Sequence, residues 1–174
     1  MVELKDATLT IDGHELFKSL SLMAQDGQLT CIAGPARAGK TALLMVMLGF
    51  LTLDDGLVSV DGELLTPLSA PAFRRLMAYL PQKRPVTISQ TEVDTSGLEA
   101  AWSPHNSRRY LLTPIEEHLD VPPMASKPII IADAPEPSLL PMLKSLAAAG
   151  HTVVVASQDE GFHSTADKLI TLGT

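Results

Sequence analysis

One eight-residue stretch limits the folds open to this chain more than any other feature. It reads GPARAGKT and runs from Gly34 to Thr41. An apolar run, LTCIA (29–33), leads into it, and a helical pattern follows through about Met47. A buried strand that enters a glycine-containing turn and leaves it as a helix is a building unit of parallel α/β folds. The stretch therefore predicts an α/β protein with a mainly parallel central sheet.

Further apolar runs extend this pattern toward the end of the chain. Segments 128–133, 151–157 and 166–173 each read as a strand, and a helix ending at Gly150 is expected between the first two. Apolar strands that alternate with helices are typical of a parallel sheet covered on both faces. We therefore expect helices on each side of the central sheet.

The first part of the chain carries a second, antiparallel pattern. Segments 2–11 and 16–24 read as two strands joined by the turn DGHE. The stretch LDDGLVSVDGELL (53–65) reads as another hairpin region, in which Asp61 and the following glycine form a tight turn. These hairpins predict an antiparallel part in front of the parallel sheet.

A short helix and an irregular segment lie between the two patterns. Ser69 is expected to cap this helix, Pro71 to lie in its first turn, and a brief strand to follow over 78–80. Residues 83–127 contain five prolines and show weak periodicity, which indicates a reduced insertion of loops and short helices. We expect residues 1–174 to form one domain.

Charge and composition exclude several classes of partner. The formal net charge is −7 and no long basic run is present, which argues against a nucleic-acid surface. The longest apolar stretch (42–51) is far shorter than the ~20 residues that span a bilayer, so we expect no direct membrane insertion. A single cysteine, Cys31, cannot build a disulfide framework and fits a reducing cytoplasm. We expect a cytoplasmic protein that reaches the inner face of a membrane only through a partner.

The GPARAGKT stretch has the pattern G-x-x-x-x-G-K-[ST], whose chemistry suits phosphate groups. Its glycines let the backbone turn with N–H groups pointing inward, and the amino terminus of the next helix adds positive potential. Lys40 is expected to reach terminal phosphates, while Thr41 and Asp133, at the end of an apolar strand, are expected to hold Mg²⁺. The candidate phosphate-binding residues are Gly34, Pro35, Ala36, Arg37, Ala38, Gly39, Lys40, Thr41 and Ala42.

The order of these elements resembles the ATP-binding subunit of an ABC transporter over nearly the whole chain. YLPQ is similar to the Q-loop of that family, IIIADAPEPS to its Walker B strand, and TVVVASQDEGF to its switch strand. The resemblance implies a P-loop NTPase three-layer fold with an N-terminal antiparallel β-subdomain. It also implies ATP and Mg²⁺ as ligands, with Gln82 beside the metal and the attacking water. Its partners would be a membrane permease subunit, an intact ATP-binding cassette, or both.

Several positions depart from the pattern that the resemblance implies. Ala134 stands where the family has a Glu that orients or deprotonates the attacking water, and a methyl group can do neither. Gln158 stands in place of the switch His, and its amide cannot carry a charge. The LSGGQ signature is missing, and residues 107–117 read SRRYLLTPIEE in its place. The remaining catalytic candidates are Gln82, Gln158 and Glu136.

Smaller departures surround the expected nucleotide. Ile11 lies near the position of the aromatic ring that stacks on adenine, Arg37 stands where the family usually has Gly, and Ala42 lacks a hydroxyl for phosphate. Together these losses predict a degenerate cassette that binds Mg-ATP and hydrolyses it weakly or not at all.

Two other functions stay open at this point. A non-catalytic scaffold could keep the fold and dock to a membrane or protein partner through the surface around Gln82. A small P-loop phosphotransferase would need arginines that converge on the phosphates, and Arg108 and Arg109 could serve.

Overall fold

An antiparallel sheet forms one outer part of the molecule. The computed structural model describes residues 1–82 and 127–173. Strands β1 (Val2–Ile11), β2 (His14–Ala24), β4 (Asp55–Val60) and β5 (Glu63–Leu64) pair in the order β2-β1-β4-β5. In β1 and β2 the buried residues largely alternate with more exposed ones, so this part of the sheet has one face on the core. This is the antiparallel part that the hairpin patterns predict.

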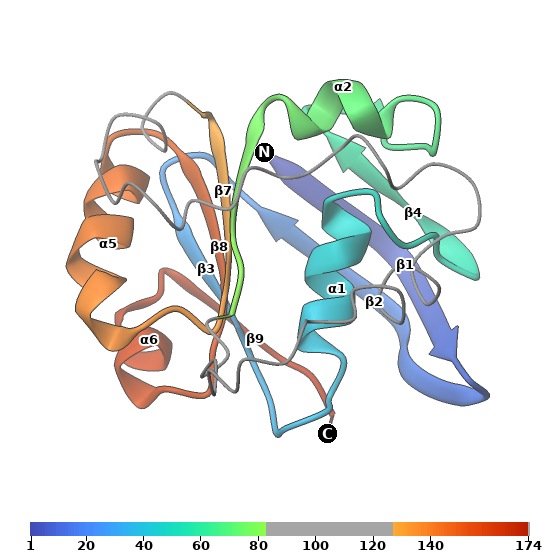
Figure 1. The fold of residues 1–174 in the computed structure, drawn as a ribbon, viewed down its shortest axis with the longest axis horizontal. Coiled ribbons are helices and arrows are strands. Elements are labelled where there is room, and N and C mark those ends of the chain that lie inside the picture. Colours follow the sequence, from blue (N-terminus) through green and yellow to red (C-terminus); the bar gives the residue numbers. More distant parts are fainter. Residues whose placement is uncertain (83–126, 174) are drawn as a thin grey trace, which may run out of the picture.

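A parallel sheet of five strands occupies the middle of the described fold (Figure 1). Its order is β6-β7-β8-β3-β9, and all four neighbouring pairs run parallel. The strands are β3 (Leu29–Ala33), β6 (Met77–Leu80), β7 (Ile129–Asp133), β8 (Thr152–Ala156) and β9 (Lys168–Thr171). Every residue of β3, β7 and β8 is buried, as expected for strands covered on both faces.

Helices cover both faces of this parallel sheet. Figure 1 shows α5 (Leu140–Ala148) and α6 (Glu160–Thr165) on one side, and α1 (Lys40–Met47) on the other, between the two sheets. A short helix, α2 (Ala70–Arg74), precedes β6, and one 3₁₀ turn (Pro137–Leu139) precedes α5. In the described part of the chain, no helix combines the length and apolar character that a membrane span needs.

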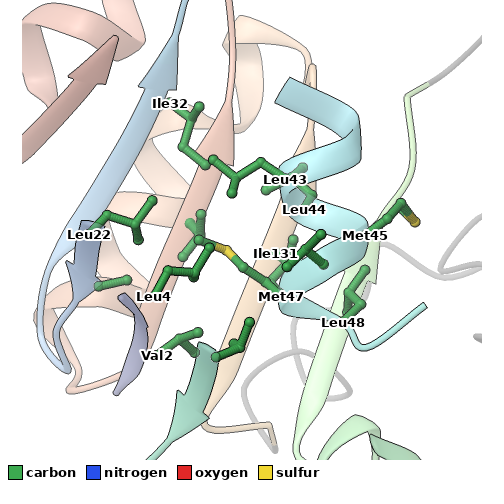
Figure 2. Packing of buried hydrophobic residues seen from close by; sticks show 14 of the residues in the cluster. Val2, Leu4, Leu22, Ile32, Leu43, Leu44, Met45, Met47, Leu48 and Ile131 are labelled. Atoms are coloured by element: carbon green, nitrogen blue, oxygen red, sulfur yellow. The ribbon is translucent and has the colours of Figure 1, made fainter. Parts of the chain in front are cut away.

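The larger hydrophobic core lies around α1. Figure 2 shows Leu43 and Met47 of this helix between Leu4 of the antiparallel sheet and Ile32 and Ile131 of the parallel sheet. All five side chains are at most 1% exposed. The core therefore fixes the helix that follows GPARAGKT against both sheets, so that its amino terminus has a defined position.

The opposite face of the parallel sheet forms a second core. Ile130 and Val155 point to this face and pack with Leu143 and Phe162 from α5 and α6. Cys31 belongs to the same cluster, and burial raises the pKa of its thiol to about 11. A thiol in this environment stays protonated and is not a reactive nucleophile at neutral pH.

The predicted fold class is confirmed, with three local differences. The helix α6 was not expected, because EGFHST has no apolar periodicity; it begins where Asp159 accepts a hydrogen bond from Gly161 N at 2.8 Å. The last strand is shorter than 166–173. Ser69 is the N-cap residue of α2, as expected, but its side chain makes no capping hydrogen bond; its hydroxyl instead accepts from Thr66 N and donates to Leu64 O.

Two expectations about chain organisation stay predictions. The reduced insertion falls almost entirely on residues 83–126, which lie outside the described residues, as do the stretch 107–117 and both Arg108 and Arg109. That residues 1–174 form a single domain is likewise a prediction.

Candidate functional site

The GPARAGKT loop connects the buried strand β3 to α1, and both of its glycines are required by the geometry. Gly34 has φ +144°, and a Cβ there would lie 2.6 Å from the Leu172 carbonyl oxygen. Gly39 has φ +85°, and a Cβ there would lie 3.1 Å from Leu16 Cβ. Both conformations are ones that residues with a side chain rarely adopt. The loop backbone is therefore held close to the neighbouring strands.

A pocket of about 460 Å³ opens beside this loop. It lies where the loop, the carboxyl ends of β7 and β8, and the strand β2 meet. This is the edge where parallel α/β sheets usually bind ligands. The pocket is lined by Leu16, Ala36, Arg37, Gly39, Lys40, Thr41, Ala42, Gln82, Asp133, Ala134, Ala156, Ser157 and Gln158.

Lys40 is the first residue of α1 and folds back over the loop. Its Nζ donates hydrogen bonds to the carbonyl oxygens of Gly34 at 2.7 Å and Pro35 at 2.6 Å. Burial lowers the pKa of this ammonium, and the nearby charge of Asp133 opposes that shift. An ammonium has three donors, so one stays available to a ligand in the pocket while the loop keeps its shape.

Thr41 and Asp133 meet in the pocket although they are far apart in the sequence. Thr41 Oγ1 donates a hydrogen bond to Asp133 Oδ2 at 2.8 Å. Burial raises the pKa of this carboxyl, while the Thr41 hydrogen bond and the Lys40 charge act in the opposite direction. Burial disfavours the charged form of this carboxylate, so a nearby cation would stabilise that form.

These two oxygens fit a magnesium ion that also binds a phosphate ligand. Mg²⁺ takes hard oxygen ligands and usually binds through one or two carboxylates together with substrate phosphates and water. Among the described residues, no group of three His, Cys, Asp or Glu side chains could hold a metal by itself. The hydroxyl and carboxylate therefore suit a metal that arrives with phosphate, rather than a closed metal site.

The catalytic candidates are only partly brought together. Gln82 and Gln158 both line the pocket and are exposed. Ala134 lines it as well, with φ +44°, and its N–H donates to Ala156 O at 2.8 Å. Glu136 is not among the lining residues; it precedes the 3₁₀ turn and is exposed. The position that follows Asp133 therefore carries a methyl group.

Two other loop residues that were predicted to bind phosphate line a second pocket. Gly34 and Pro35 line a more open hollow of about 520 Å³, which Ala36 and Gln158 share with the first pocket. Neither pocket has Ala38 or Ile11 among its lining residues. Instead Leu16, from the facing strand β2, borders the first pocket.

Sequence reasoning missed Leu16 and Ser157 as pocket residues. Leu16 lies in an alternating strand and carries no chemical signal. Ser157 is buried after β8, where its Oγ accepts from Asp159 N at 3.0 Å and its carbonyl oxygen lies 3.0 Å from His163 Nε2. The position of Ser157 directly before Gln158 could have marked it, because both follow the same apolar strand.

Comparison with known proteins is consistent with this geometry. Residues 17–135 match the family model described as ABC transporter. The chain thus has the fold and loop of a nucleotide-binding cassette, and it belongs to the ABC transporter family. In solved structures, an ATP-binding subunit of an ABC transporter covers 99% of this chain and 85% of its own, with a TM-score of 0.68 and 17% identity. The cassette MJ0796 bound to ADP and Pi matches with a TM-score of 0.65 and 19% sequence identity, and the match covers 99% of this chain and 94% of that one.

Curated relatives of this chain are ATP-binding proteins of different transport systems, so they do not identify one transported substrate for this chain. The intermembrane phospholipid transport system ATP-binding protein MlaF of Escherichia coli K12 is 30% identical over 70% of this chain. The Fe(3+) ions import ATP-binding protein FbpC 2 of Pectobacterium atrosepticum is 33% identical over 47% of it. The matched stretches span only 41% and 24% of those two proteins.

Proposed function

We propose that this chain is a nucleotide-binding cassette of an ABC transporter assembly that binds Mg-ATP and hydrolyses it weakly or not at all. The observation that carries the proposal is the meeting of Lys40, Thr41 and Asp133 in one pocket at the end of the parallel sheet. An ammonium, a hydroxyl and a carboxylate in this arrangement match the needs of a nucleotide's phosphates and their metal.

Each residue has a definite role in this proposal. The backbone N–H groups of the loop from Gly34 to Gly39 and the amino terminus of α1 bind phosphate oxygens. Lys40 places its third donor on the terminal phosphates. Thr41 and Asp133 hold Mg²⁺, which screens the charge of the phosphates when it is bound. Gln82 and Gln158 contact the metal side of the same pocket through neutral amides.

We expect weak hydrolysis because the residue next to Asp133 in the pocket cannot act as a general base. Ala134 lies beside Asp133, and its methyl group can neither take a proton from water nor orient it. Losing one general base typically lowers a rate by about 10²–10⁴-fold. Glu136 lies outside the lining of the pocket and is a poor replacement. The neutral Gln158 removes a second source of charge.

Partners are inferred from the relatives. MlaF and FbpC 2 are named as ATP-binding proteins of transport systems, and MJ0796 has a dimeric structure. We infer that this chain assembles with a membrane permease subunit, an intact cassette, or both, and thereby reaches the cytoplasmic side of a membrane.

Calorimetric titration with ATP, with and without Mg²⁺, tests the binding part of the proposal. We expect Mg²⁺ to strengthen ATP binding, and Lys40→Ala to weaken it by about 100-fold, which corresponds to about 2.7 kcal/mol. Lys18→Ala is the matched control, because Lys18 is an exposed lysine of β2 outside the pocket.

No binding at millimolar ATP by a folded wild-type protein would overturn nucleotide binding and favour the scaffold. Phosphoryl transfer from ATP to a small molecule would instead favour a phosphotransferase.

A further inference from the structure

Arg37 has an unusual backbone for a residue that carries a long side chain. Its φ is +66°, in the left-handed region that L-residues other than Asn and Asp rarely enter. Among the residues that line the first pocket, Ala134 and Gly39 also have positive φ, but neither carries a functional group. The loop therefore tolerates a strained arginine at a position where glycine would be relaxed.

The side chain of Arg37 borders the pocket and has no partner in the described part of the protein. It is exposed, and none of the hydrogen bonds or ion pairs of residues 1–82 and 127–173 involves it. Lys40, by contrast, donates two hydrogen bonds to carbonyl oxygens of the loop. A guanidinium has five donors in a planar fork that matches phosphate oxygens. Among residues 1–82 and 127–173, Arg37 is thus the pocket cation whose side-chain donors have no hydrogen-bond acceptor.

The charged side chains among the described lining residues carry a net positive charge. Arg37 and Lys40 supply two positive charges, and Asp133 is the single carboxylate among the described lining residues. An excess positive charge favours the more negative of two related ligands. ATP carries one more negative charge than ADP because of its additional phosphate.

We propose that Arg37 is a phosphate-binding residue that makes this pocket prefer nucleoside triphosphates over diphosphates. The inference rests on the proposed function, since it assumes that the pocket binds a polyphosphate. The guanidinium forms charge-assisted hydrogen bonds to the terminal phosphate, in addition to those from Lys40. This contact comes from the chain's own loop, and therefore does not need a second subunit to close over the ligand.

The test compares ATP, ADP and inorganic tripolyphosphate by calorimetry on wild type, Arg37→Gln and Arg37→Lys. Glutamine removes the charge but keeps a side chain on the same backbone, and lysine keeps the charge without the fork. Arg75→Gln is the matched control, because Arg75 is exposed directly after α2 and is not among the residues that line the pocket. We expect Arg37→Gln to weaken ATP binding about tenfold and ADP binding about twofold, with Arg37→Lys in between.

The outcomes separate this inference from the proposed function. Equal ATP-to-ADP affinity ratios in wild type and Arg37→Gln would overturn the role of Arg37 while leaving ATP binding intact. Arg37-dependent binding of tripolyphosphate without binding of ATP would show that Arg37 binds phosphate, but it would overturn both the nucleotide cassette and the preference for nucleoside triphosphates. If folded wild-type protein binds none of the three ligands, both fail.

Discussion

The phosphate loop and the ends of β7 and β8 border the same pocket but differ in what they retain. The loop keeps glycines at positions 34 and 39, and it carries Lys40 and Thr41, which we propose bind phosphate and metal. The ends of the strands keep Asp133 but offer Ala134 and Gln158 beside it. The comparison teaches that holding a phosphate and cutting it depend on separate groups, so one can persist without the other.

The largest expected effect concerns the loop backbone. Gly34→Ala should lower the free energy of unfolding by about 3 kcal/mol, because its Cβ meets the Leu172 carbonyl oxygen at 2.6 Å and its φ is +144°. Gly13→Ala is the control: its φ is also positive, at +76°, but a Cβ there meets nothing within 4 Å. It should lose only about 1 kcal/mol. Denaturant unfolding measures both, and equal losses would show that the close approach is unimportant.

The next effect concerns the carboxylate missing from the edge of the pocket. Ala134→Glu should raise Mg-ATP hydrolysis by about 100-fold over Ala134→Gln, at the lower end of what a general base contributes. The glutamine variant has nearly the same shape and the same strained backbone, but cannot take a proton. Phosphate release is the measurement. Equal rates in the two variants would mean that the missing charge at Gln158, or a missing partner, limits the reaction instead.

A third effect concerns pH and the buried carboxyl of Asp133. Burial raises its folded-state pKa above that of the unfolded chain, so the folded protein binds more protons between the two values. Stability from this group is therefore present at low pH and declines as pH rises from about 4, the ordinary Asp pKa, through the raised value. Asp133→Asn should remove this decline, which unfolding curves at several pH values would reveal. A wild-type minus variant difference that rises with pH would contradict the assignment.

The smallest effect concerns the strained arginine in the loop. Arg37→Gly should raise the free energy of unfolding by less than about 1 kcal/mol, because relief of the left-handed backbone is partly offset by the entropy that glycine loses on folding. Thermal unfolding without ligand measures it, with Arg75→Gly as the charge-matched control. A loss of stability in Arg37→Gly would indicate that the arginine stabilises the loop rather than a ligand.

Much of the fold could be predicted because its signals are local. Apolar runs mark β3, β7 and β8, each buried over its full length, and the alternating segments mark β1 and β2. The helix α6 was missed because only one of its residues, Phe162, is buried, so its sequence shows no helical repeat of apolar residues. Ser69 occupies the expected N-cap position, but its side chain makes no capping hydrogen bond because a neighbouring turn competes for its hydroxyl.

The candidate site could be predicted only where a motif was involved. The loop and Asp133 were found because their residue types and their places after strands carry a recognisable chemistry. Leu16 and Ser157 were not, because their contribution depends on which strand faces the loop. A catalytic role for Glu136 stays a prediction: this residue lies close to Asp133 in sequence, but it is not among the residues that line the pocket.

The sequence by itself determined that this chain has a parallel α/β core with a phosphate-type loop, since hydrophobic periodicity and glycine spacing are properties of neighbouring residues. Only the tertiary structure decided which distant groups share the pocket. Thr41 and Asp133 meet because β3 and β7 both pair with β8, which places the carboxyl ends of parallel strands at one edge. The same packing leaves Arg37 facing the pocket without a partner in the described residues, a feature that no local pattern contains.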